Sequence, residues 1–316
     1  MNLDTLLSDT ATTADPTPGT LAAARTRLDD RIQTAGVVVL AHRRRAHRRR
    51  AGLSLVGAAA ALGLVLTSWS PFGGTSAPEA EAAEVLLTAS GAAAGQPDVA
   101  ADATYWHTVS TSRQDTAGDV GTEHHREVWV SRSGPGLLLD GESDQPQGLP
   151  AASFTVGGST VDWNGLDSLP TDPVALRTRL LSDTAETSRR PDDVLVMMVT
   201  DLLVESPASP ELRAALWQVV SQVPNVRLVG DVTDAAGRPG VAVEQTVDYD
   251  GSAGTETRRL VVDTNDGRLL ERVDTFDGFG QDADLTFRQT FLEHGPAQEL
   301  PVQPELPDGC TSFRGC

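Results

Sequence analysis

The chain has 316 residues and a formal net charge of −19, and all 25 of its Lys and Arg residues are arginine. The lack of lysine excludes enzymes that depend on a Schiff-base lysine or a P-loop lysine. The charge is distributed unevenly along the chain. Residues 1–50 carry nine Arg and five Asp, residues 51–78 carry no charge, and residues 79–316 carry sixteen Arg against thirty-nine Asp and Glu. Phosphate backbones are repelled by a body this acidic, so we expect no nucleic-acid binding there.

The basic head over residues 1–50 begins with a polar stretch and continues with apolar residues at helical spacing. These are Leu21, Ala24, Leu28 and Ile32. The spacing predicts a short amphipathic helix within residues 20–40. Such a helix can bind a cytoplasmic protein partner, or it can simply extend a membrane helix, and both alternatives stay open. The head contains no Cys, so it lacks the usual ligands of a zinc-binding anti-sigma factor.

An uncharged apolar run over residues 51–70 follows two Arg triplets, at 43–45 and 48–50. As a helix, Ala51 to Trp69 would span ~28 Å, which matches the hydrocarbon core of a membrane. The preceding arginines place the head in the cytoplasm and the acidic body outside. A cleaved signal peptide with a cut near residue 82 is the alternative, but the head is too long for a standard signal. A buried soluble helix is disfavoured, because no core places six arginines against its first turn.

A linker rich in Gly, Ser and Pro is expected over residues 71–83, followed by an outer domain over 84–300 and a tail over 301–316. We predict a helix over 81–95, and strands over 104–111, 122–131, 136–142 and 152–158. Three helices follow, over 169–182, 190–206 and 209–224, with Thr171 or Asp172 and then Ser209 as N-caps. Two hairpins over 226–251 and 256–278 and a strand over 283–295 complete the domain.

Hairpins without crossover helices predict an antiparallel sheet. The fold class is therefore α+β, with a curved, half-barrel-like antiparallel sheet and helices packed on one face. An apolar slot between sheet and helices is the expected ligand site. The tryptophans at 106, 129, 163 and 217 fit core and sheet packing better than a sugar-binding platform.

Several segments occur in a characteristic order after the basic head and the single membrane helix. They are "YWHTVS", "EVWVS", "LPTDPVALRTRL", "SPELRAALWQVV", "GRPGVAV" and "DTNDGRLLE". In this order they resemble actinobacterial single-pass membrane-anchored proteins of uncharacterised function, often encoded beside extracytoplasmic-function sigma factors. The outer domains of that family are similar to the LolA/LppX-like lipid-carrier fold, which also serves in a periplasmic regulator of an anti-sigma factor. The resemblance assigns no catalytic residues.

Glu123, His124, His125 and Glu127 are weak metal candidates. On a strand, Glu123, His125 and Glu127 share one face, which suits Zn, while His124 faces the other way and could be joined by His107 of the neighbouring strand. A solvated polar sheet face explains these residues equally well, and we expect no metal or cofactor.

Cys310 and Cys316 are the two cysteines of the chain. They predict a disulfide if the C-terminal end lies outside the cytoplasm.

The sequence contains no G-x-S-x-G, P-loop or H-E-x-x-H motif, so we expect no enzyme. Three hypotheses remain. The first is an extracytoplasmic binding or sensing domain for an apolar ligand or a protein. The second is a regulator that couples an outer sensor to a cytoplasmic partner such as a sigma factor. The third is a lipid or lipoprotein carrier.

Overall fold

The structure is a computed structural model that describes residues 77–141, 145–184, 189–249, 254–278, 285–306 and Phe313. The predicted amphipathic helix, the predicted membrane helix over 51–70 and the cysteines at 310 and 316 lie outside these residues. They therefore remain predictions. Within the described part of the chain, no helix is both long and apolar enough to cross a membrane.

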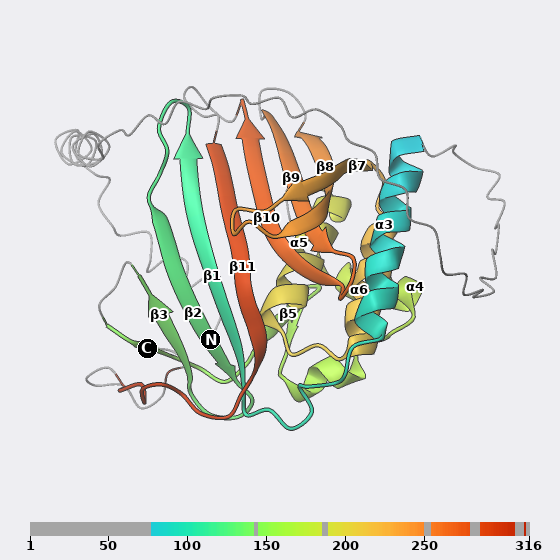
Figure 1. Cartoon of the computed structure of the whole chain (residues 1–316). Coiled ribbons are helices and arrows are strands. Elements are labelled where there is room, and N and C mark those ends of the chain that lie inside the picture. The colour runs from blue at the N-terminus through green and yellow to red at the C-terminus, as the bar shows by residue number, and fades with distance from the viewer. Residues whose placement is uncertain are drawn as a thin grey trace, which may run out of the picture. The chain divides into compact units, whose positions relative to one another are not determined.

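The described residues form an antiparallel sheet of nine strands in the order β4-β3-β2-β1-β11-β10-β9-β8-β7 (Figure 1). Neighbouring strands also follow one another in the sequence, except β1 and β11, which bring the start and end of the domain together. The predicted α+β class with an antiparallel sheet is confirmed. The strands are β1 Tyr105–Thr116, β2 Glu123–Ser131, β3 Gly136–Asp140, β4 Gln147–Leu149, β7 Val226–Thr233, β8 Pro239–Tyr249, β9 Gly254–Asp263, β10 Arg268–Asp277 and β11 Leu285–Ala297, with a separate hairpin of β5 Phe154–Val156 and β6 Ser159–Val161.

The helices in the described residues are α3 Ala77–Ala94, α4 Pro173–Leu180, α5 Pro191–Glu205 and α6 Pro210–Ser221, with a 3₁₀ turn at Asn164–Ser168. Helices α4, α5 and α6 each begin with proline, whose missing N–H is harmless in the first turn. The side chains of Asp172 and Ser209 accept the backbone N–H groups of Ala175 and Leu212, which confirms both predicted caps. Helix α5 contacts β1, β10 and β11, and α6 contacts α3, α4 and α5 (Figure 1).

Helix α3 begins at Ala77, inside the range that we predicted to be linker. The prediction gave too much weight to Pro78, which is tolerated in a first helical turn. Glu79 stabilises the same turn through the helix dipole, and the alanines that follow are strong helix formers. Ala82 is fully buried, because α3 packs along α6 and β7.

One core joins the helices to one face of the sheet. It includes Leu86 of α3, Leu195 of α5, Leu216 of α6, Val262 of β9 and Phe291 of β11. The four tryptophans that we predicted to pack in the core and on the sheet are all buried, with at most 6 % of their surface exposed, which confirms the predicted packing.

A bulge in β11 changes which side chains face the helices. Val109 of β1 pairs with Glu293 and Ser110 pairs with Phe291, so Leu292 has no partner residue in β1. The residue after a bulge points to the face opposite to the one that strict alternation gives it. His294 therefore faces the helices, on the same side of the sheet as Phe291.

Charged side chains fill the space between the start of α5 and strands β9 and β10. Arg258, which is 5 % exposed, pairs with Asp193 at 2.8 Å, Glu256 at 2.6 Å and Asp274 at 2.7 Å. The network is closed by Arg189 and Tyr249, which each contact both Asp193 and Glu256. Ion pairs thus occupy part of the place where we expected an apolar slot.

Candidate ligand-binding pocket

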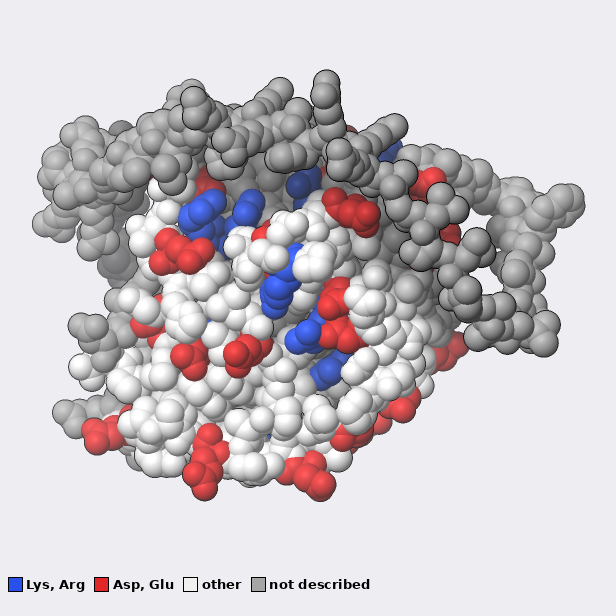
Figure 2. Space-filling model, in the orientation of Figure 1, with Lys and Arg blue, Asp and Glu red and all other residues white. Residues whose placement is uncertain are grey.

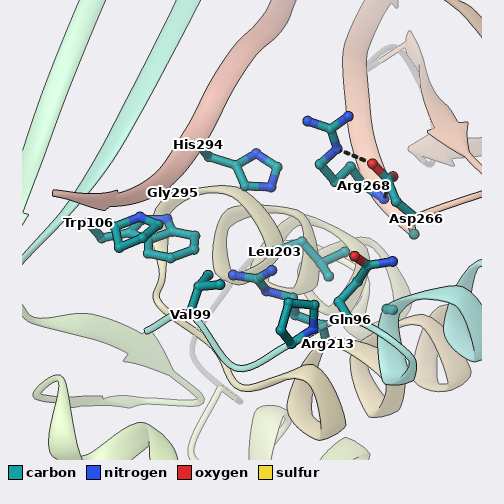
Figure 3. Close-up of a pocket in the computed structure, with 13 residues that line it drawn as sticks. Gln96, Val99, Trp106, Leu203, Arg213, Asp266, Arg268, His294 and Gly295 are labelled. Carbon is teal, nitrogen blue, oxygen red and sulfur yellow. Dashed lines mark hydrogen bonds and ion pairs between the residues drawn. The ribbon is translucent and has the colours of Figure 1, made fainter. Parts of the chain in front are cut away.

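A pocket of about 240 Å³ lies where six elements meet (Figure 3). The end of α3, the last turns of α5, the first turn of α6, the β9–β10 turn and the ends of β1 and β11 surround it. Ala93, Val99, Trp106 and Leu203 supply apolar lining, and Gln96, Arg213, Asp266, Arg268 and His294 supply the polar groups. An apolar wall with a few convergent polar groups is the usual form of a small-molecule site.

Arg213 is positioned by the start of α6, where its backbone N–H donates to the carbonyl oxygen of Ser209 at 2.9 Å. Its guanidinium carbon lies 4.9 Å from the centre of the Trp106 ring, over the indole face. Figure 3 shows the guanidinium reaching into the pocket toward Trp106. A cation is attracted to the face of an indole, so Trp106 orients the guanidinium.

The Arg213 side chain also has a hydrogen-bond donor without an acceptor. Its Nε is buried and has no hydrogen-bond partner among the described residues. A buried donor without a partner costs about 1–3 kcal/mol, and more for a charged group. Burial lowers the pKa of Arg213, while Asp98 acts in the opposite direction. The guanidinium nevertheless stays charged, because the ordinary pKa of arginine is far above neutrality.

His294 faces the pocket from β11 as a neutral side chain. Burial lowers its pKa to about 3, and the positive charges of Arg213, Arg268 and Arg238 act in the same direction. Its ring centre lies 6.0 Å from that of Trp106. A neutral imidazole offers one hydrogen-bond donor and one acceptor, so His294 adds polarity without adding charge.

The β9–β10 turn supplies the remaining charges of the pocket. Asp266 accepts the backbone N–H of Arg268 at 3.0 Å and forms an ion pair with its Nε. The charge of Arg268 is therefore balanced within the turn. Of the two arginines that line the pocket, Arg213 is the one without an ion pair to a described residue.

The predicted metal candidates lie elsewhere, on strand β2. Glu127 interacts with Nε2 of His107 and Nε2 of His125 at 3.2 Å each, on the face of the sheet away from the helices. In the described residues, no group of three or more His, Cys, Asp and Glu side chains has an arrangement that could hold a metal ion. Glu123 shares the face of Glu127, and His124 points to the opposite face, as the alternation predicted.

The expected pairing of His107 with His124 is wrong. The register of β1 and β2 places His107 opposite Trp129 and His124 opposite Ser112, so the two histidines face opposite sides of the sheet. His107 instead stacks on Trp129, with ring centres 4.1 Å apart. The sequence shows which residues alternate within each strand, but not the register between strands.

Two further hollows are weaker candidates. One, of about 250 Å³, lies between α5 and β5 and includes Met197, Met198, Asp201 and Glu205. Asp201 is 52 % exposed and already pairs with Arg272 at 3.2 Å. The other, of about 350 Å³, is lined mainly by polar residues at the β1–β2 hairpin, including His124, and by Phe287 of β11, and its Arg113 pairs with Asp115. Neither combines an aromatic wall with an arginine that lacks an ion pair.

Our sequence analysis did not single out Arg213 or His294. A signal for Arg213 exists, because Trp217 and Val220 follow it at i+4 and i+7 and all three lie along one stripe of α6. A charged residue on a stripe that is otherwise buried is an informative exception. His294 has no comparable signal, since strict alternation from Phe291 places it on the opposite face.

No protein-family model and no curated protein matches the chain. One similar solved structure is a LolA superfamily protein from Nitrosomonas europaea, 8 % identical, with a TM-score of 0.21 over 70 % of this chain and 94 % of that one. Another is a DUF1329 family protein from Desulfovibrio piger, 10 % identical, with a TM-score of 0.20 over 72 % of this chain and 95 % of that one. Likeness at this level carries no argument, so the α+β architecture rests on the strands and helices described above.

Proposed function

We propose that the acidic body is a binding domain that holds a small ligand in the pocket between Trp106, Arg213 and His294. The observation that carries this proposal is the convergence of an indole face, an apolar wall and an arginine without an ion pair on one cavity. The volume of about 240 Å³ is below the ~300–1,000 Å³ typical of sites for drug-sized ligands. It therefore favours a small ligand over the diacyl chains that a lipid or lipoprotein carrier must hold.

The protonation behaviour of the pocket supports binding rather than catalysis. General acid–base catalysis needs a group whose pKa lies near the working pH. The pKa of His294 lies near 3, so its imidazole is a poor proton acceptor at neutral pH. Arg213 and Arg268 keep their protons, and Asp266 is engaged by Arg268. We therefore propose that this pocket binds a ligand and does not catalyse a reaction.

We further propose that the domain is anchored by residues 51–70 and faces the outside of the cell membrane. The Arg triplets before the apolar run and the acidic body after it support this orientation. In this arrangement the head over residues 1–50 is cytoplasmic. Binding in the pocket could then be sensed outside and transmitted to a cytoplasmic partner, such as a sigma factor, through the predicted helix within residues 20–40.

Binding is tested with the full-length protein in detergent and a library of small aromatic and aliphatic fragments, observed by saturation-transfer NMR. Val99→Trp fills the pocket from a side chain that is 44 % exposed, so the core is not disturbed. Val174→Trp is the matched control, because Val174 is 64 % exposed on α4 and lies away from the pocket. We expect fragments that bind the wild type and the control but not Val99→Trp. Equal binding to all three proteins, or to none, would contradict the proposal.

Topology is tested with reporters fused to the C-terminus. We expect alkaline phosphatase, which is active only outside the cytoplasm, to be active, and green fluorescent protein exported by the general secretory route to stay dark. The reverse pattern would contradict the orientation. A mature N-terminus near residue 83 would show that the apolar run is a cleaved signal rather than an anchor.

A further inference from the structure

We infer that the pocket recognises a small monoanionic carboxylate with a flat apolar body, and that Arg213 is the residue that binds the carboxylate. The inference rests on the proposed function as a binding domain and adds the chemical class of the ligand.

One of the arginines around the pocket has no counter-charge among the described residues. Arg268 is paired with Asp266, and Arg238, which acts on His294 from the neighbouring hairpin, is paired with Asp234 at 2.6 Å. Arg213 makes no ion pair with a described residue, and its interaction with Asp98 is electrostatic without a direct contact. One unbalanced cation is neutralised by one negative charge, so a monoanion fits better than a dianion.

The surroundings of the pocket make an unpaired arginine unusual. Residues 79–316 carry thirty-nine acidic side chains against sixteen arginines, so a carboxylate partner for Arg213 would be easy to supply from the chain itself. Figure 2 shows arginine side chains over the upper and central part of one face, with acidic side chains beside several of them and along the lower edge.

The orientation of Arg213 suits a carboxylate. The indole of Trp106 covers one face of the guanidinium, so the hydrogen-bonding edges remain for a ligand. Nε itself is buried out of reach of a ligand, so the donors left for a ligand are those of the two terminal nitrogens, which form no ion pair with a described residue. A carboxylate can accept hydrogen bonds from these nitrogens and would balance the charge of the guanidinium.

The rest of the pocket suits an uncharged, flat body. Val99 and Leu203 provide apolar contacts beside Trp106. Gln96 and the neutral His294 add polar contacts without charge, and the charges of Arg268 and Asp266 balance each other. A phosphate group has no apolar body to use these walls, and its second charge would remain unbalanced.

The test compares three probes on the full-length protein in detergent by isothermal titration calorimetry. Benzoate has the proposed chemistry, benzamide keeps the shape without the charge, and inorganic phosphate has the charge without the apolar body. We expect benzoate to bind at least ~10-fold more tightly than benzamide, as for a charge-assisted hydrogen-bonded pair, and phosphate to bind most weakly. Arg213→Met should remove the preference for benzoate, while Arg213→Lys should keep part of it.

Arg259→Met is the matched control, because Arg259 is 46 % exposed and pairs with Glu244 at 3.1 Å, away from the pocket. It should leave the preference for benzoate unchanged. Thermal unfolding of each variant shows whether it is folded, and Arg213→Lys keeps the test valid if Arg213→Met is not. Equal affinity for benzoate and benzamide, or tighter binding of phosphate, would overturn the inference but leave a binding pocket. No binding of benzoate or benzamide to the wild type would also overturn the inference, whereas the fragment screen with Val99→Trp decides separately whether the pocket binds a small ligand.

Discussion

The indole Nε1 of Trp217 donates a 2.8 Å hydrogen bond to the carbonyl oxygen of Gly267. This bond joins α6 to the β9–β10 turn. The turn also lies against α3, since a Cβ atom placed on Gly267 would be 2.5 Å from the carbonyl oxygen of Ala89. Asp266 and Arg268 flank Gly267, so the same contacts fix one wall of the pocket.

Replacing Gly267 with alanine should lower the free energy of unfolding by about 2–4 kcal/mol. Gly267 has φ +74°, which costs about 1 kcal/mol for a residue with a Cβ, and the clash with α3 adds the remainder. Gly237→Ala is the matched control, because Gly237 also lies in a hairpin turn, at φ +83°, but nothing lies within 4 Å of its Cβ position. Gly237→Ala should therefore lower the free energy of unfolding by only the ~1 kcal/mol that the positive φ costs. Urea unfolding measures both values, and equal losses would show that the turn does not pack on α3.

Arg258→Met should destabilise the protein by about 3–5 kcal/mol at neutral pH, because it leaves buried carboxylates without their cation. Burial by itself raises the pKa of Asp193, but Arg258, with the hydrogen bonds from Arg189 and Tyr249, holds the pKa below its usual value. The stabilisation from Asp193 is thus present above about pH 4 and is lost as the pH falls further.

The control for Arg258 is its neighbour in β9. Arg259 points to the other face, where it is 46 % exposed, and Arg259→Met should cost less than about 1 kcal/mol. Chemical unfolding at pH 7 and again near pH 3 should show a large effect of Arg258→Met at the higher pH and a smaller one at the lower. A loss independent of pH would mean that packing, rather than charge, explains it.

His294 should make stability depend on pH above the range in which carboxylates titrate. Its pKa is about 3 in the folded protein and about 6.5 in the unfolded chain, so the unfolded state binds more protons between these values. The free energy of unfolding should therefore fall by up to about 1.4 kcal/mol per pH unit below pH 6.5. His294→Gln should flatten the curve between pH 6.5 and 4. A histidine resonance of the wild type that titrates near pH 6.5 and disappears in His294→Gln would contradict the prediction.

Phe313 should protect the short edge strand β4. Its ring occupies the space beside Gly148 that a Cβ atom would fill. Phe313→Ala and Gly148→Ala should therefore both accelerate amide hydrogen exchange in a peptide covering Gln147–Leu149. Leu306→Ala is the control, since Leu306 is 43 % exposed and should leave this exchange unchanged. If neither variant affects β4, the contact has no protective role.

Cys310 and Cys316 should form a disulfide in protein isolated from cells, if the C-terminal end lies outside the cytoplasm. Alkylation of the denatured protein should then modify both thiols only after reduction, as measured by mass spectrometry. The closed loop is short, so reduction should change thermal stability little. Alkylation without reduction would argue against both the disulfide and the proposed orientation.

The local sequence was sufficient for most of the elements. Prolines at 173, 191 and 210, with the caps Asp172 and Ser209, marked the helix starts, and alternation within β2 assigned Glu127 and Trp129 to one face correctly. The strands β4 and β6 were missed, because neither has a buried residue, whereas β5, which is equally short, was predicted from the alternation of Phe154 and Val156 with Thr155. The start of α3 was placed too late, because a proline near a helix start also fits a linker.

The sequence by itself determined the acidic body, the antiparallel strands and their helices, since periodicity and capping depend on neighbouring residues. Only the tertiary structure decided the pocket. The bulge at Leu292 turned His294 toward the helices, and the packing of the β9–β10 turn on α3 and α6 brought Arg268 near Arg213. Register and turn packing depend on contacts between residues far apart in the chain, and such contacts produce no pattern among neighbouring residues of the sequence.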